Sequence, residues 1–92
     1  MISTRKKIEI CNKLIKLRLE EMPNNNLYHF AQKQMELIDS KLQKDGKLNE
    51  DDYRGVRIGL MCAKELENID DEFCNAVYIM LEDIGPKIDW GF

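Results

Sequence analysis

The chain has little of what metal-dependent or hydrolytic enzymes use. It contains one histidine, His29, and its three cysteines are far apart, with no C-x-x-C pair. A structural zinc site needs four Cys or His ligands at close spacing, and a nucleophilic triad needs a base beside its nucleophile. The sequence also has no glycine-rich phosphate loop after a strand pattern. We therefore expect no catalytic residues, no metal site and no bound cofactor.

Long apolar runs are also missing. Runs such as residues 58–63 are far shorter than the roughly 20 apolar residues that a membrane-spanning helix needs. The basic residues 1–7 are not followed by an apolar core, so we expect no signal peptide. An odd number of widely spaced cysteines is typical of reduced, buried thiols in a cytosol. These observations predict a cytoplasmic protein without a membrane segment.

The composition is that of one soluble domain. The chain has 92 residues, of which 43% are hydrophobic and 34% are charged, and we treat residues 1–92 as a single domain. The charge is unevenly spread: residues 1–22 are mostly basic, whereas residues 65–92 are acidic and hold a single basic side chain, Lys87. An acidic end repels nucleic-acid phosphates and suits a basic protein surface. We expect a protein partner and no nucleic acid.

Apolar residues recur at three- and four-residue spacing, which predicts helices. The expected helices cover about residues 4–22, 27–44, 50–67 and 71–84. Pro23, Gly46 and Asp70 mark ends and caps between them, because proline and glycine stop helices and aspartate caps them. The loops are short, so sequential helices should pack antiparallel. The predicted fold is all-α, a single-domain bundle of about four antiparallel helices.

The third predicted helix carries two special features. Asn49 is its expected cap, and its expected buried stripe runs over Tyr53, Val56, Leu60 and Ala63. Gly55 and Gly59 lie four residues apart on this helix. Glycine inside a helix costs about 1 kcal/mol relative to alanine. Two such residues therefore indicate a close approach of another backbone, either from a neighbouring helix or from a partner.

The acidic stretch from Glu65 to Glu72 is the main candidate for a recognition surface. Charge of one sign speeds association with a partner of opposite charge, and tyrosine is over-represented at binding hot spots. The predicted partner-binding residues are Glu65, Asp70, Asp71, Glu72 and Glu82, with Tyr53 and Tyr78 as anchors. A contact surface on the first or second helix is the alternative. Trp90 and Phe92 are expected to fold back over the bundle.

Several segments of the sequence resemble a known family. They are Ala31–Ile38, Ile58-Gly59, Ala63-Lys64-Glu65-Leu66, Asp70–Phe73 and Ala76-Val77-Tyr78. In this order and spacing they resemble small helical bacterial immunity proteins, in particular those that guard against a type VI secreted NAD(P)+ glycohydrolase toxin. The resemblance covers about residues 27–80. It implies a cytosolic antitoxin, not an enzyme, that binds a cognate toxin domain and occludes its active site.

Other functions stay open at this point. The chain could be a helical adaptor or a homo-oligomeric structural protein, or an immunity protein against a contact-dependent-inhibition toxin of other chemistry. A nucleic-acid regulator would use the basic first helix, but its basic residues scatter around that helix instead of forming one stripe. We expect the free protein to be a monomer or a weak homodimer.

Overall fold

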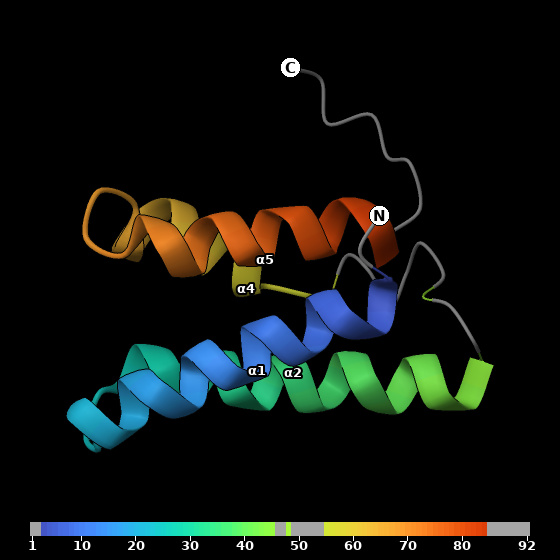
Figure 1. The fold of residues 1–92 in the computed structure, drawn as a ribbon, viewed down its shortest axis with the longest axis horizontal. Coiled ribbons are helices and arrows are strands. Elements are labelled where there is room, and N and C mark those ends of the chain that lie inside the picture. Colours follow the sequence, from blue (N-terminus) through green and yellow to red (C-terminus); the bar gives the residue numbers. More distant parts are fainter. Residues whose placement is uncertain (1–2, 46–47, 49–54, 85–92) are drawn as a thin grey trace.

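The computed structural model describes residues 3–45, 48 and 55–84. Within these residues the elements are the α-helices α1 (Thr4–Glu21), α2 (Asn26–Asp45), α4 (Ile58–Met61) and α5 (Asp71–Ile84), and the π-helical turn η1 (Cys62–Leu66). The described part of the chain contains no strand (Figure 1). The predicted all-α class and helical bundle are confirmed.

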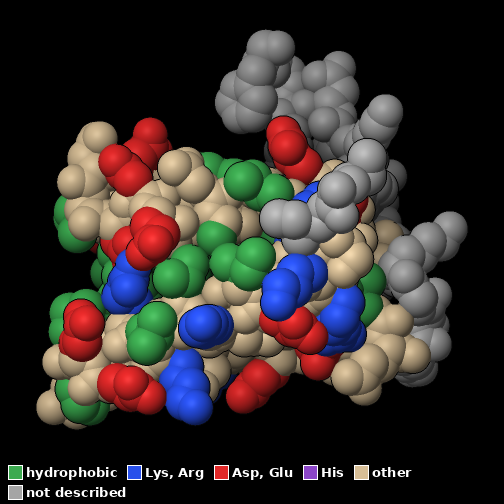
Figure 2. Space-filling model, in the orientation of Figure 1, with side chains coloured by type: hydrophobic (Ala, Val, Ile, Leu, Met, Phe, Trp, Pro, Cys, Tyr) green, Lys and Arg blue, Asp and Glu red, His purple; other side chains and the backbone are tan. Residues whose placement is uncertain are grey.

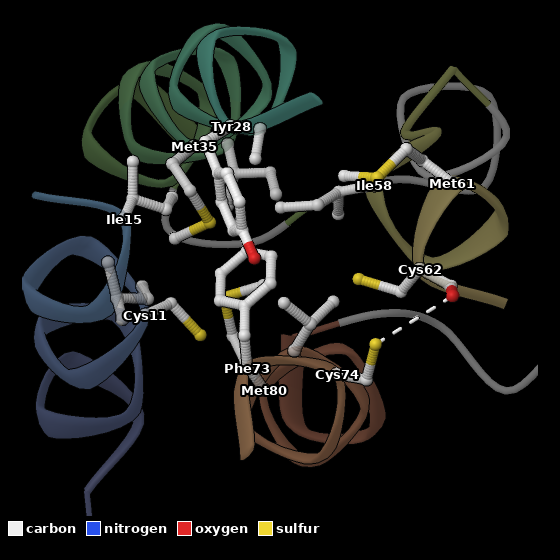
Figure 3. Packing of buried hydrophobic residues seen from close by; sticks show 14 of the residues in the cluster. Cys11, Ile15, Tyr28, Met35, Ile58, Met61, Cys62, Phe73, Cys74 and Met80 are labelled. Atoms are coloured by element: carbon white, nitrogen blue, oxygen red, sulfur yellow. Dashed lines mark hydrogen bonds between the residues drawn. The ribbon is translucent and has the colours of Figure 1, made fainter. Parts of the chain in front are cut away.

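The helices surround one core on four sides. Figure 3 looks into this core and shows α1, α2, the α4–η1 segment and α5 around the buried side chains. Helix α1 packs against both α2 and α5, and α4 also packs against both. In Figure 1, α1 runs antiparallel to α2 and to α5. As a result, the C-terminal end of α1 lies beside the N-terminal end of α5.

Helix ends follow the capping residues. The Ser3 hydroxyl accepts from the Lys6 amide at 3.2 Å at the start of α1. The Asn25 side chain accepts from the Leu27 amide at 2.9 Å at the start of α2. A capping side chain satisfies amides that the first helical turn leaves unpaired. The predicted bounds of α1, α2 and α5 are therefore confirmed to within about one residue.

The core is apolar and includes all three cysteines. Phe73 is fully buried, and its ring meets the Tyr28 ring at a centroid distance of 5.6 Å with the planes tilted by 60°. Cys11, Cys62 and Cys74 are buried free thiols, as expected. Burial raises the pKa of Cys11 to about 11. Such thiols stay protonated at neutral pH and act as small apolar side chains.

The prediction for the third helix is partly wrong. Helix α4 begins only at Ile58, and Gly55 lies in a turn before it. The expected cap Asn49 and the stripe residue Tyr53 lie outside the described residues. Leu60 and Ala63 are exposed, whereas the buried face consists of Ile58, Met61, Cys62 and Leu66.

Gly59 lies where α4 packs against α5. A Cβ on Gly59 would lie 2.8 Å from Leu81 Cδ1, so α4 approaches α5 closely at this residue. Neighbouring residues on a helix point about 100° apart. Leu60 therefore points to another side of α4 than Gly59, and there it is 48% exposed. The atom that approaches Gly59 is the end of the Leu81 side chain, whereas the sequence predicted another backbone there, and Gly55 takes no part in this helix.

Candidate functional site

Residues 66–72, which we call the acidic turn, join η1 to α5. Asn68 takes a left-handed backbone conformation with φ of 68°, which asparagine tolerates better than most residues. The amides of Ile69 and Asp70 both donate to the Leu66 carbonyl, at 2.9 and 2.8 Å. These bonds close the turn and leave the Ile69 side chain 77% exposed. The turn therefore presents an apolar side chain among carboxylates.

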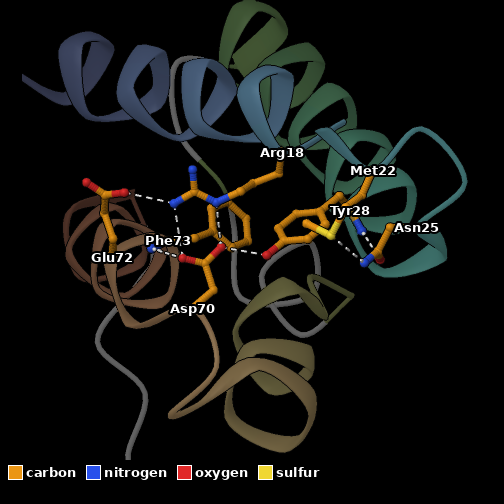
Figure 4. Close-up of polar contacts among 7 residues, drawn as sticks. All are labelled: Arg18, Met22, Asn25, Tyr28, Asp70, Glu72 and Phe73. Carbon is orange, nitrogen blue, oxygen red and sulfur yellow. Dashed lines mark hydrogen bonds and ion pairs between the residues drawn. The ribbon is translucent and has the colours of Figure 1, made fainter. Parts of the chain in front are cut away.

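Asp70 anchors the acidic turn to the rest of the bundle (Figure 4). Its carboxylate accepts two bonds from the Arg18 guanidinium, from Nε at 2.9 Å and from Nη2 at 3.2 Å. It also accepts from the Tyr28 hydroxyl at 2.5 Å and from the Phe73 amide at 3.3 Å. Arg18 Nη2 donates to Glu72 as well, at 2.8 Å. One carboxylate thus caps α5 and joins it to both α1 and α2.

Burial and hydrogen bonding act in opposite directions on the Asp70 carboxyl. Its side chain is 9% exposed, and the Arg18 side chain is 18% exposed. Burial alone raises the pKa of Asp70, but the bonds from Arg18, Tyr28 and the Phe73 amide stabilise the anion and lower the pKa below its ordinary value. For Tyr28, burial and the bond to Asp70 raise the pKa. At neutral pH Asp70 is therefore a charged carboxylate that accepts hydrogen bonds from the neutral Tyr28 hydroxyl and from the Arg18 guanidinium.

The remaining predicted site residues lie in different surroundings. Four acidic side chains are exposed: Glu65, Asp71, Glu72 and Glu82. Tyr78 is half-buried on α5, and Tyr53 lies outside the described residues. Asp70, Asp71 and Glu72 are neighbours in the acidic turn, whereas Glu82 is about 15 Å further along α5 at 1.5 Å per residue. The structure thus brings the turn residues together and leaves Glu82 near the other end of α5.

The other end of α5 carries a second polar contact with α1. The Thr4 hydroxyl donates to Asp83 Oδ2, and Lys7 Nζ lies 3.5 Å from the same oxygen. The Thr4 bond and the Lys7 charge lower the pKa of Asp83. On the face drawn in Figure 2, basic side chains gather over α1 and acidic side chains lie over both ends of α5. Helices α1 and α5 are therefore tied at both ends by opposite charges.

Several basic side chains of α1 form ion pairs with acidic side chains of this same chain. Arg5 pairs with Asp39 of α2 at 2.8 Å, and Lys7 and Arg18 pair with α5. The role of Arg18 could not be predicted from the sequence, because its partner Asp70 is 52 residues away and no local pattern links them. The role of Tyr28 likewise has no local sign in the sequence, and Tyr28 is 2% exposed in the core.

An apolar groove lies between α2 and the α4–η1 segment. Its walls are Leu27 and Phe30 on one side and Leu60 and Met61 on the other, and its volume is about 330 Å³. The side chains of Arg57, Lys64 and Glu65 complete the lining. A groove with apolar walls and charged groups beside them is typical of surfaces that bind another molecule.

Two other kinds of site have no counterpart in the part of the chain that the structure describes. No group of three or more His, Cys, Asp or Glu residues there could hold a metal ion. None of the described helices combines the length and the apolar character that crossing a bilayer requires.

Comparison with known proteins identifies one relationship. The model of the Tsi6 family matches residues 5–80. This range contains all but the first residue of α1, the whole of α2, the groove, the acidic turn and most of α5. The searches of curated proteins and of solved structures gave no significant match.

Proposed function

This chain belongs to the Tsi6 family of type VI secretion immunity proteins, and we propose that it binds a cognate secreted toxin domain in the cytoplasm and occludes the active site. The toxin is an NAD(P)+ glycohydrolase in this proposal, because the sequence resembles immunity proteins against toxins of that activity. The observation that carries the proposal is the family match over residues 5–80.

The chemistry of an inhibitor supports this role. An immunity protein needs a rigid scaffold, a charged recognition surface and a few anchors, and it needs no catalytic residues of its own. A cleft that binds a dinucleotide attracts its phosphates with positive charge. Exposed carboxylates are suitable groups to fill such a cleft, and Glu65, Asp71 and Glu72 are exposed at or beside the acidic turn.

The proposal gives the predicted residues different tasks. Glu65, Asp71 and Glu72 contact the toxin, and Glu82 extends the contact along α5. Asp70 holds the acidic turn in place, since its carboxylate is occupied by Arg18 and Tyr28. Tyr53 and Tyr78 stay proposed anchors.

Co-expression tests the function as a whole. The gene just upstream of this one in its own genome is expressed in a sensitive bacterium with and without this protein, and growth and cellular NAD+ are measured. We expect the neighbour to stop growth and deplete NAD+, and this protein to restore both. Rescue of growth without any change in NAD+ would keep the immunity role and replace the toxin chemistry. A harmless neighbour, or no rescue, would contradict the proposal and favour the adaptor function.

A charge-reversal pair tests the recognition surface. Glu65→Lys with Glu72→Lys should weaken toxin binding at least tenfold in calorimetry, because two attractive charges become repulsive. Glu72 is an exposed partner of Arg18 at 71% exposure, so the fold should persist. The matched control reverses two exposed acids elsewhere, Glu20→Lys with Glu36→Lys, and should bind like the wild type. Equal affinity of both double variants would remove the acidic turn from the interface.

A further inference from the structure

The groove between α2 and α4 leaves large apolar side chains in water. Phe30 is 37% exposed on one wall and Leu60 is 48% exposed on the other. Exposed apolar surface that lines a concavity is stabilised when another apolar group enters it and displaces water. The groove therefore fits an occupant with a bulky aliphatic or aromatic side chain.

The charges beside the groove restrict the occupant further. Arg57 and Lys64 line it together with Glu65, so the balance of charge is positive. Neither Arg57 nor Lys64 has an ion-pair partner within the described residues. An apolar side chain flanked by carboxylates would satisfy the groove and its two cations together.

The same chain presents such a group on its surface. Ile69 is more exposed, at 77%, than any other large apolar side chain in the described residues. Glu67 and Asp71, both exposed, flank it in the acidic turn. The Asn68 amide donates to Asp71 Oδ1 at 2.8 Å, so one of the flanking carboxylates is held by the turn itself. A group that is already ordered loses little entropy when it binds.

We propose that the groove binds the acidic turn of a second copy of this chain. Ile69 of each copy enters the groove of the other, where Glu67 and Asp71 meet Arg57 and Lys64. Each chain carries both surfaces, so a two-fold arrangement uses both contacts and closes at two copies. The acidic turn is also part of the surface assigned above to toxin binding, so the dimer and the toxin complex exclude each other. The dimer itself depends on neither the family match nor the toxin.

The first test measures the mass of the full chain in solution. Light scattering or sedimentation equilibrium is recorded from micromolar to near-millimolar protein, at low and high salt. We expect the mass to rise from one chain to two with concentration, and the rise to need more protein at high salt because salt screens the flanking charges. A mass of one chain at all concentrations would overturn the proposal.

Single substitutions then locate the contact. Ile69→Asp and Leu60→Asp should each keep the protein at the mass of one chain where the wild type is half dimeric. Both side chains are exposed, so the helical spectrum and melting temperature should stay close to those of the wild type. The control is Ile79→Asp, which changes an isoleucine of α5 that is 52% exposed and outside the groove, and it should associate like the wild type. Loss of association in the control as well would overturn the proposed contact.

Mixing the two defective variants gives the sharpest result. Ile69→Asp retains an intact groove and Leu60→Asp retains an intact Ile69, so a mixed dimer contains one complete contact. We expect the mixture to form dimers at concentrations where neither variant does so alone. A mixture that stays at the mass of one chain would contradict the reciprocal contact. If the wild type is a monomer and Leu60→Asp instead loses toxin binding, the groove belongs to the toxin and not to a second copy.

Discussion

Helix α5 is tied to α1 at both ends, and the two ties differ in kind. At its N-terminal end, Arg18 and Asp70 form a two-point ion pair whose side chains are 18% and 9% exposed. At its C-terminal end, Lys7 and Asp83 are 3.5 Å apart, with side chains 21% and 33% exposed. The first carboxylate accepts bonds from three different residues, whereas the second depends on Thr4 and one lysine.

We expect the number of satisfied hydrogen bonds to determine stability more than the presence of opposite charges. A shielded carboxylate loses its hydration and depends on the protein groups that replace it, so removing one partner leaves an uncompensated polar group. An exposed carboxylate is hydrated in any case, and its ion pair adds little. The two ties look alike in a list of ion pairs, yet they should respond differently to substitution.

The largest effect is expected for Asp70→Ala. This change strands the Arg18 guanidinium and the Tyr28 hydroxyl and removes the cap of α5, and it should lower the free energy of unfolding by about 3 kcal/mol. Urea unfolding followed by circular dichroism measures the loss. The double variant Arg18→Met with Asp70→Leu should recover part of it, because no charge is then left without a partner. A loss of unfolding free energy below about 1 kcal/mol for Asp70→Ala would contradict a strong contribution of the Arg18–Asp70 ion pair to stability.

The contribution of the Arg18–Asp70 ion pair should also appear in the pH dependence of the free energy of unfolding. The pKa of Asp70 is lower in the folded protein than in the unfolded chain, where an aspartate has a pKa of about 3.9. The stabilisation from its charge is therefore present above that value and is lost as the pH falls through the folded-state pKa. Unfolding free energies of the wild type and Asp70→Asn, measured from neutral to strongly acidic pH, should converge at the acidic end. A constant gap over the whole range would rule out this contribution.

The smallest effect is expected for Asp83→Asn at the other tie. The amide keeps a hydrogen-bond acceptor for Thr4 and removes only an exposed charge. The urea midpoint should stay within experimental error of the wild type, in the same measurement that separates Asp70→Ala. A loss comparable with that of Asp70→Ala would show that burial does not distinguish the two ties.

The helices that could be predicted from the sequence are those whose ends are determined by nearby capping or helix-stopping residues. Ser3, Pro23 and Asp70 act through their own neighbours, so α1 and α5 could be placed from the chain alone. The segment before α4 could not be placed, because two sets of residues at helical spacing overlap there. Which set is buried depends on how α4 packs against α2 and α5, which is a tertiary feature. The π-helical turn η1 shifts the helical spacing further.

The sequence indicated which acidic residues belong to the candidate site, but it did not indicate how their side chains are arranged in space. The acidic residues from Glu65 to Glu72 were recognised as a group, but the inward role of Asp70 depends on Arg18 and Tyr28, which come from two other helices. The groove was also missed, since the residues that line it come from two distant segments and none is unusual in its own sequence context. Sites built from distant segments leave no local pattern in a single sequence.

The tie between Arg18 and Asp70 also bears on synthesis. It joins residues 52 positions apart, and α1 finds its main packing partner, α5, near the end of the described chain. Contacts of such long separation form late, because a long loop must close before they are made. The bundle therefore cannot close until the ribosome has released residues up to about Ile84. Chains that end before α5 would leave in water the apolar side chains of α1 that pack against α5, and we expect cellular proteases to degrade such chains.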